Sequence, residues 1–111
     1  MADPELLTLP ELAVKLDVDV TKARQLIRDG AVLAVRGEDG VLRVPAAFLQ
    51  DGRPVKGLPG VITLLRDNGY SDDEALSWLF ADDASLPGTP IEALAANRGT
   101  EVKRRAQALG W

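Results

Sequence analysis

Residues 8–30 read TLPELAVKLDVDVTKARQLIRDG, and this stretch predicts two short helices joined by a tight turn. The first helix is expected to begin after Thr8 and to end near Leu16, because leucine and alanine recur between them at helical spacing. Thr8 and Glu11 have the spacing of a capping box, in which each side chain accepts a hydrogen bond from the other residue's amide. Two short helices in this order favour a helix-turn-helix.

The second expected helix, residues 20–29, carries different side chains on its two sides. Asp19 is placed to cap its first turn, and Gly30 is placed to end it in a left-handed conformation. On a helical wheel, the apolar arc holds Val20, Ala23, Leu26 and Ile27. The polar arc, with Arg24 at its flank, holds Thr21, Lys22, Gln25, Arg28 and Asp29. Cations, amides and hydroxyls suit phosphates and base edges, so the polar arc is a candidate DNA-binding surface.

A β-hairpin is predicted directly after these helices. Residues 31–36 and 41–44 are rich in β-branched and small residues, and the intervening residues 37–40 read GEDG, which is typical of a hairpin turn. Arg36 and Arg43 lie on either side of this turn. A hairpin in this position is the wing of a winged helix-turn-helix, and its arginines are candidates for contacts with the DNA backbone or the minor groove.

The remainder of the chain reads as helices. The loop over residues 51–54 is the best candidate boundary, and it predicts a winged helix-turn-helix domain over residues 1–54 and a C-terminal helical domain over residues 55–111. Helix starts are expected at Leu58-Pro59, Ser71-Asp72-Asp73-Glu74, Thr89-Pro90-Ile91-Glu92 and Val102. The predicted fold class is therefore mostly α, with a small β part.

The charge of the chain is unevenly distributed. The net charge is −4, which by itself argues against a nucleic-acid partner. Residues 20–56, however, hold seven basic and four acidic residues, whereas the segments on either side are acidic. The positive excess therefore coincides with the second expected helix and the wing, where DNA would bind.

The side chains that are present exclude several classes of function. The sequence has no cysteine and no histidine, so it offers no thiolate metal site, no cysteine nucleophile and no Ser-His-Asp hydrolase site. Carboxylates cluster at residues 72–74 and 82–83, but the first cluster fits the start of a helix, where anions are stabilised. We therefore expect no enzyme activity, no bound metal and no cofactor.

The sequence also predicts a location and an oligomeric state. No apolar run approaches the roughly 20 residues of a membrane span. The first residues, MADPE, are acidic, whereas a signal peptide begins with basic residues. A cytoplasmic protein without a membrane partner is therefore expected. No heptad pattern or long dimerisation helix is present, so a monomer is favoured over a homodimer.

Several segments resemble known DNA-binding families. The N-terminal half is similar to the excisionase/MerR type of winged helix through Thr8–Ala13, Leu16–Val18 and Ile27–Gly30. Nearly the whole chain resembles a small actinobacterial family of winged helix-turn-helix DNA-binding proteins, which includes a mycobacterial substrate of a membrane Ser/Thr protein kinase. The segments that carry this second resemblance are Leu33–Arg36, Val55–Gly60, Gly69-Tyr70, Trp78–Phe80 and Arg104–Ala108.

The resemblance implies DNA binding by the N-terminal half and a helical C-terminal domain. It also places the chain in a family with a kinase substrate, whose target is a threonine ahead of the first helix. Thr8 does not match that threonine, because it is expected to cap the helix, and the sequence begins close to this position. Control by phosphorylation is therefore not carried over to a residue of this chain.

The leading hypothesis is a transcriptional regulator that reads duplex DNA with helix 20–29 and the 34–44 wing. The alternative is a protein-interaction module that binds a partner through the C-terminal domain. Trp78-Leu79 and the segment Leu86–Leu94 loosely resemble the toxin-binding domain of some antitoxins. The same residues are also explained as the core of the domain and a helix connector with a capping box.

Overall fold

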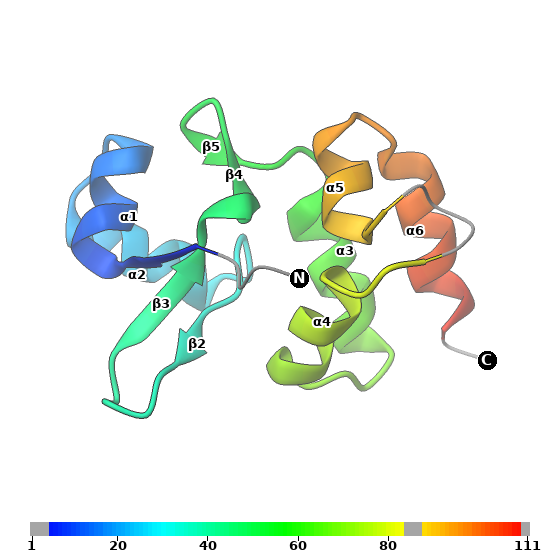
Figure 1. The fold of residues 1–111 in the computed structure, drawn as a ribbon, viewed down its shortest axis with the longest axis horizontal. Helices are drawn as coiled ribbons and strands as arrows, with labels where there is room; N and C mark the ends of the chain where they lie inside the picture. The colour runs from blue at the N-terminus through cyan, green and yellow to red at the C-terminus, as the bar shows by residue number, and fades with distance from the viewer. Residues whose placement is uncertain (1–4, 84–87, 110–111) are drawn as a thin grey trace. The chain divides into compact units, whose positions relative to one another are not determined.

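The computed structural model describes residues 5–83 and 88–109. The chain divides into two compact units, Met1–Pro54 and Val55–Trp111. Among the described residues, the first unit contains two α-helices and two small antiparallel sheets, and the second contains four α-helices (Figure 1). The predicted class, mostly α with a small β part, is confirmed. None of the described helices has the length and apolar character needed to cross a membrane.

The helix-turn-helix forms as its capping residues predict. Helix α1 spans Leu9–Leu16 and helix α2 spans Val20–Arg28. The capping box at α1 is present, with the Thr8 amide donating to Glu11 Oε1 at 2.9 Å. At α2, Asp19 Oδ1 accepts from the Lys22 amide at 2.8 Å. Both helix starts are therefore fixed by side chains close in sequence, which explains why they could be located without a structure.

A three-stranded sheet packs with these helices. Its strand order is β1-β3-β2, with β1 over Leu6–Thr8, β2 over Val35–Arg36 and β3 over Leu42–Pro45. The hairpin between β2 and β3 is present, but its first strand is shorter than residues 31–36. The sequence gives no sign of β1, because three residues are too few to show alternation and the last of them caps α1.

The structure of residues 45–54 also differs from the sequence prediction in two ways. Pro45 lies just beyond the strand expected over residues 41–44, but it pairs with Leu6 at the end of β3. The residues after it form a 3₁₀ turn, Ala46–Phe48, and then a second small sheet of β4, Leu49–Gln50, and β5, Arg53–Pro54. The loop expected over residues 51–54 is therefore partly paired.

The core of the first unit joins the helices to the sheet. Its buried apolar residues are Leu7, Leu12, Ala13, Ala23, Val32, Leu33, Val44 and Phe48. Of the apolar arc of α2, Ala23 is fully buried and Leu26 and Ile27 are half-buried. Val20, which the helical wheel places on the same apolar arc, does not pack with the others and is 37% exposed at the start of the helix.

The second unit contains four helices: α3 over Leu58–Asp67, α4 over Asp72–Leu79, α5 over Pro90–Ala95 and α6 over Gly99–Ala108. Capping boxes open α4 and α5 as predicted. Helix α6 begins at Gly99, three residues before the expected start. Helices α3 and α6 pack together, and Asn68 Nδ2 donates to the Ala106 carbonyl at 2.8 Å. Leu86 and Pro87 of the antitoxin-like segment lie outside the described residues.

Candidate nucleic-acid interface

The outer side of α2 presents a row of polar side chains to solvent. Thr21, Gln25 and Arg28 are spaced by four and three residues, so they lie along one face of the helix, and all three are exposed. Arg24 is exposed beside them. Within the described part of the chain, no hydrogen bond or ion pair engages the side chains of Arg24 or Arg28. The two guanidinium groups are therefore available to an anionic ligand.

Lys22 lies away from the middle of this row. It is exposed, but it precedes the fully buried Ala23 and lies one turn before the half-buried Leu26. Its backbone amide is the group that Asp19 caps. Lys22 is therefore placed on a flank of the surface, while Thr21, Gln25 and Arg28 form its centre. We call this surface, Thr21, Lys22, Arg24, Gln25 and Arg28, the α2 face.

The two wing arginines are bonded within the hairpin itself. Arg36 Nη1 donates to the Gly40 carbonyl at 2.6 Å. Arg43 makes a two-pronged ion pair with Asp39, with Nη2–Oδ2 at 2.9 Å and Nη1–Oδ1 at 3.2 Å. Asp39 Oδ1 also accepts from the Val41 amide at 3.0 Å. The hairpin therefore uses its own cations to hold its turn.

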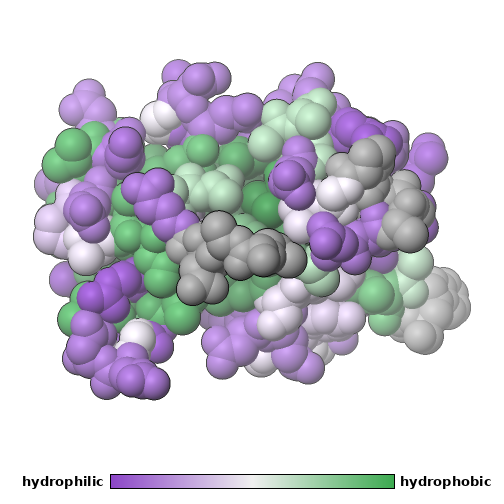
Figure 2. All heavy atoms as spheres, in the orientation of Figure 1, coloured by the Kyte–Doolittle hydropathy of each residue, from purple (hydrophilic) through white to green (hydrophobic). Residues whose placement is uncertain are grey.

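This pairing changes the electrostatics of the turn. The hydrogen bonds from Arg43, followed by the one from the Val41 amide, lower the pKa of Asp39 to about 2. The same contact with Asp39 raises the pKa of Arg43. Glu38 adds a second exposed carboxylate at the turn. Figure 2 shows hydrophilic residues gathered over the tip of this hairpin, at the lower left of the view.

Gly37 lies directly against the ion pair of Arg43 and Asp39. A Cβ atom at this position would lie 2.9 Å from both Arg43 Nη1 and Asp39 Oδ1. Real Cβ atoms do not approach so closely, so a larger residue would force the ion pair to shift. The glycine that marks the turn in the sequence thus also leaves room for the guanidinium group to fold over it.

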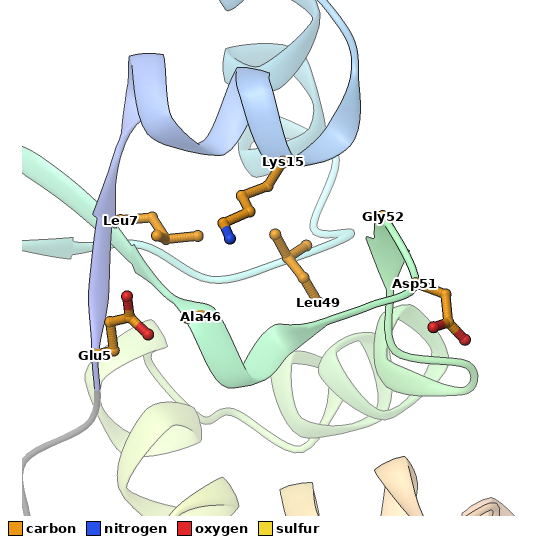
Figure 3. A pocket seen from close by; sticks show the side chains of 7 residues that line it. All are labelled: Glu5, Leu7, Lys15, Ala46, Leu49, Asp51 and Gly52. Carbon is orange, nitrogen blue, oxygen red and sulfur yellow. The ribbon is translucent and has the colours of Figure 1, made fainter.

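The first unit also has a small pocket beneath α1. It is lined by Glu5, Leu7, Lys15, Ala46, Leu49, Asp51 and Gly52. Figure 3 shows the Lys15 side chain reaching between Leu7 and Leu49, while Asp51 points away from it. The volume of about 260 Å³ is below that of most small-molecule sites. Over residues 5–83 and 88–109, no group of three or more acidic side chains is arranged to hold a metal ion.

The candidate residues lie on α2, β2 and β3, in the helix and hairpin expected for them, but two features of these elements were not predicted. Asp39 was not identified as the partner of Arg43, although their separation of four residues across a tight turn was a usable signal. The helical wheel also placed Val20 on the apolar arc, whereas this residue is exposed at the start of α2. Val20 directly follows the N-cap, which is where a helix-turn-helix first meets its ligand.

Comparisons with known proteins match both units. Residues 1–49 match the family model described as "DNA-binding protein Rv2175c, wHTH domain", and residues 55–110 match "Rv2175c C-terminal domain of unknown function". The chain is 41% identical over 115 residues to DNA-binding protein Rv2175c of Mycobacterium tuberculosis, covering 93% of this chain and 79% of that protein. The NMR structure of Rv2175c superposes with a TM-score of 0.88 at 38% identity, covering 100% of this chain and 84% of the other.

Proposed function

Because the chain belongs to the Rv2175c family of winged helix-turn-helix DNA-binding proteins, we propose that it binds duplex DNA through the α2 face and regulates transcription. In this proposal Met1–Pro54 is the DNA-binding domain, and Val55–Trp111 is a helical domain that accompanies it. The protein acts in the cytoplasm, where it meets the DNA of a bacterial cell, and it acts without catalysis or a cofactor.

The observation that carries this proposal is the exposed and unengaged α2 face. An α-helix fits the major groove of B-DNA, and its outward side chains then reach base edges. Gln25, at the centre of the row, suits the paired acceptor and donor of adenine. Arg24 and Arg28 suit phosphates or the two acceptors of guanine. The Thr21 hydroxyl, near the start of the helix, suits either a base edge or a phosphate.

Fluorescence anisotropy with duplex DNA tests this proposal directly. We expect the wild-type protein to bind at low salt, and its affinity to fall as salt rises, because phosphate contacts release counterions. The variant Arg24→Ala/Arg28→Ala should bind at least tenfold more weakly, with a salt slope smaller by about two units. The matched control is Arg104→Ala/Arg105→Ala, which removes the same charge from exposed positions of α6. Equal losses in both variants would contradict the proposal, because a general charge effect would then explain them.

The second candidate function is partner binding by Val55–Trp111. Trp78 is half-buried and borders a shallow hollow of about 240 Å³ with Ala81, Asp82, Asp83 and Pro90. A partly exposed indole is a common anchor of protein interfaces. Pull-down with the full chain and with Trp78→Ala would test this candidate, and the absence of any protein retained by wild type alone would count against it.

For the chain by itself we propose a monomer, which light scattering tests.

A further inference from the structure

We propose that Asp39 takes the place of a DNA phosphate at Arg43, so that the wing contributes no phosphate contact of its own while this pair is formed. This inference rests on the proposed DNA binding and adds to it a residue that sets specificity. It gives the hairpin a role opposite to that expected from its two arginines. The wing limits sequence-independent binding instead of supplying it.

Asp39 occupies the two N–H groups of Arg43 that would bind a phosphate. A guanidinium group binds carboxylate and phosphate with the same two parallel hydrogen bonds, so one ligand excludes the other at the same pair of N–H groups. Arg43 directs Nη1 and Nη2 at the two oxygens of Asp39, at 3.2 and 2.9 Å. Its side chain is 29% exposed, so a phosphate could reach it if the carboxylate were absent.

The carboxylate is also held in place from its other side. The Val41 amide donates to Asp39 Oδ1, and Gly37 leaves the space that the pair occupies. Because these contacts are formed by the turn itself, no rearrangement of the chain is needed to bring the two groups together. The lowered pKa of Asp39 means that this carboxylate stays charged at neutral and mildly acidic pH.

The charge of the hairpin supports the same conclusion. Residues 36–43 hold two arginines and two acidic residues, so the hairpin has no net charge. Residues 20–28 hold three cations and no acid. Arg36 is also engaged, through the Gly40 carbonyl. A phosphate therefore meets unengaged cations at α2 and engaged ones at the wing.

A consequence for specificity follows from how proteins read DNA. Phosphate contacts strengthen binding to every sequence, and only base contacts distinguish one sequence from another. An internal ligand at Arg43 removes one sequence-independent contact and leaves the α2 face unchanged. The ratio of specific to non-specific affinity then depends more on α2.

The test compares Asp39→Asn with Glu38→Gln in the full chain. Both variants remove one negative charge from the same turn, but only the first removes the charge that pairs with Arg43 and the acceptor of its Nη2. The Asn side chain keeps one oxygen for the Val41 amide. The probe is a duplex of random sequence. Its binding to each variant is measured by fluorescence anisotropy from low to moderate salt concentration. We expect Asp39→Asn to bind roughly two- to fivefold more tightly than Glu38→Gln, the range set by a solvent-exposed ion pair. Its salt slope should be larger by about one unit.

A double variant, Asp39→Asn/Arg43→Ala, has the net charge of the wild type and should return the affinity to the wild-type value. Asp39→Ser repeats the test in case the Asn side chain disturbs the turn, and thermal melting shows that each variant is folded. Equal affinities for Asp39→Asn and Glu38→Gln, or a gain that survives loss of Arg43, would overturn the inference while the proposed function stands. If wild type and every variant fail to bind any duplex at low salt, the proposed function itself fails, and this inference with it.

Discussion

The α2 face and the β2–β3 hairpin contain similar cations but use them in opposite ways. Arg24 and Arg28 have no acidic residue three or four positions away on their helix, so their guanidinium groups remain in solvent. Arg43 has Asp39 four positions earlier across a tight turn, and the two groups are paired at 2.9 Å. Equal numbers of arginines therefore do not mean equal positive potential. The potential around an arginine depends on whether an acidic residue lies close enough in the same short segment to pair with it.

Two arginines of the second unit are paired in the same way as Arg43. Arg66 pairs with Asp72 at 3.1 Å, and Arg98 pairs with Glu101 at 2.7 Å. Such exposed pairs contribute little to folding stability. In each pair the guanidinium group is already hydrogen-bonded to a carboxylate, so it is less available to an anionic ligand.

The largest expected effect concerns the contacts of Gln25 with base edges, and it should differ between a preferred and a random duplex. Gln25→Ala should cost about 1–3 kcal/mol on the preferred sequence, because the paired hydrogen bonds to a base are lost. On a random duplex the same change should have little effect, since no phosphate contact is removed. The preferred sequence would be selected from a random duplex library, and both affinities would be measured by anisotropy. Equal losses on both duplexes would mean that α2 contacts only the backbone.

The next largest effect is expected in the loss of DNA affinity when Arg28 or Arg43 is replaced. Arg28→Ala should weaken binding about tenfold, or about 1.4 kcal/mol, because a charge-assisted contact is lost. Arg43→Ala should change affinity by less than about twofold, since its guanidinium is already occupied. Salt titrations of both variants would check this result. A larger loss at Arg43 than at Arg28 would reverse the assignment of the two regions.

The stability of α2 itself is expected to depend on its cap. Asp19→Ala should lower the free energy of unfolding by about 1 kcal/mol, because the Lys22 amide loses its acceptor. Asp19→Ser keeps an acceptor at this position and removes the charge, so its stability should stay close to that of the wild type. Urea unfolding monitored by circular dichroism measures both. Similar losses in the two variants would show that charge, and not capping, stabilises the start of α2.

The smallest expected effect is the dependence of stability on pH. The pKa of Asp39 is lowered from 3.8 to about 2 by Arg43, and the pKa of Glu11 is lowered from 4.5 by its hydrogen bonds with Thr8. A carboxyl group whose pKa is lowered on folding stabilises the protein above its unfolded pKa, and this contribution disappears as pH falls through the folded value. Stability should therefore decline below about pH 4.5.

The variant Asp39→Asn isolates the hairpin's share of this decline. It should lose less stability than the wild type between pH 4 and pH 2, because its position 39 cannot be protonated. Urea unfolding at several pH values in this window measures the difference. Identical pH profiles for the two proteins would indicate that the ion pair with Arg43 is also formed in the unfolded chain.

Much of the fold was predictable wherever neighbouring residues decide the outcome. Capping boxes fixed the starts of α1, α4 and α5, and the GEDG turn located the hairpin. The polar side of α2 was also predictable, because the helical period alone determines which residues share a side. Each of these features depends on residues no more than a few positions apart.

The sequence alone thus determined the helix-turn-helix, the position of the hairpin and the cations that each carries. Only the tertiary structure decided that Leu6 pairs with Pro45, a contact between residues distant in sequence that closes a third strand onto the hairpin. It likewise decided that Val20 is exposed and that Arg43 is bonded to Asp39. Strand register and side-chain pairing depend on competition among many partners in three dimensions, and local propensity does not resolve that competition.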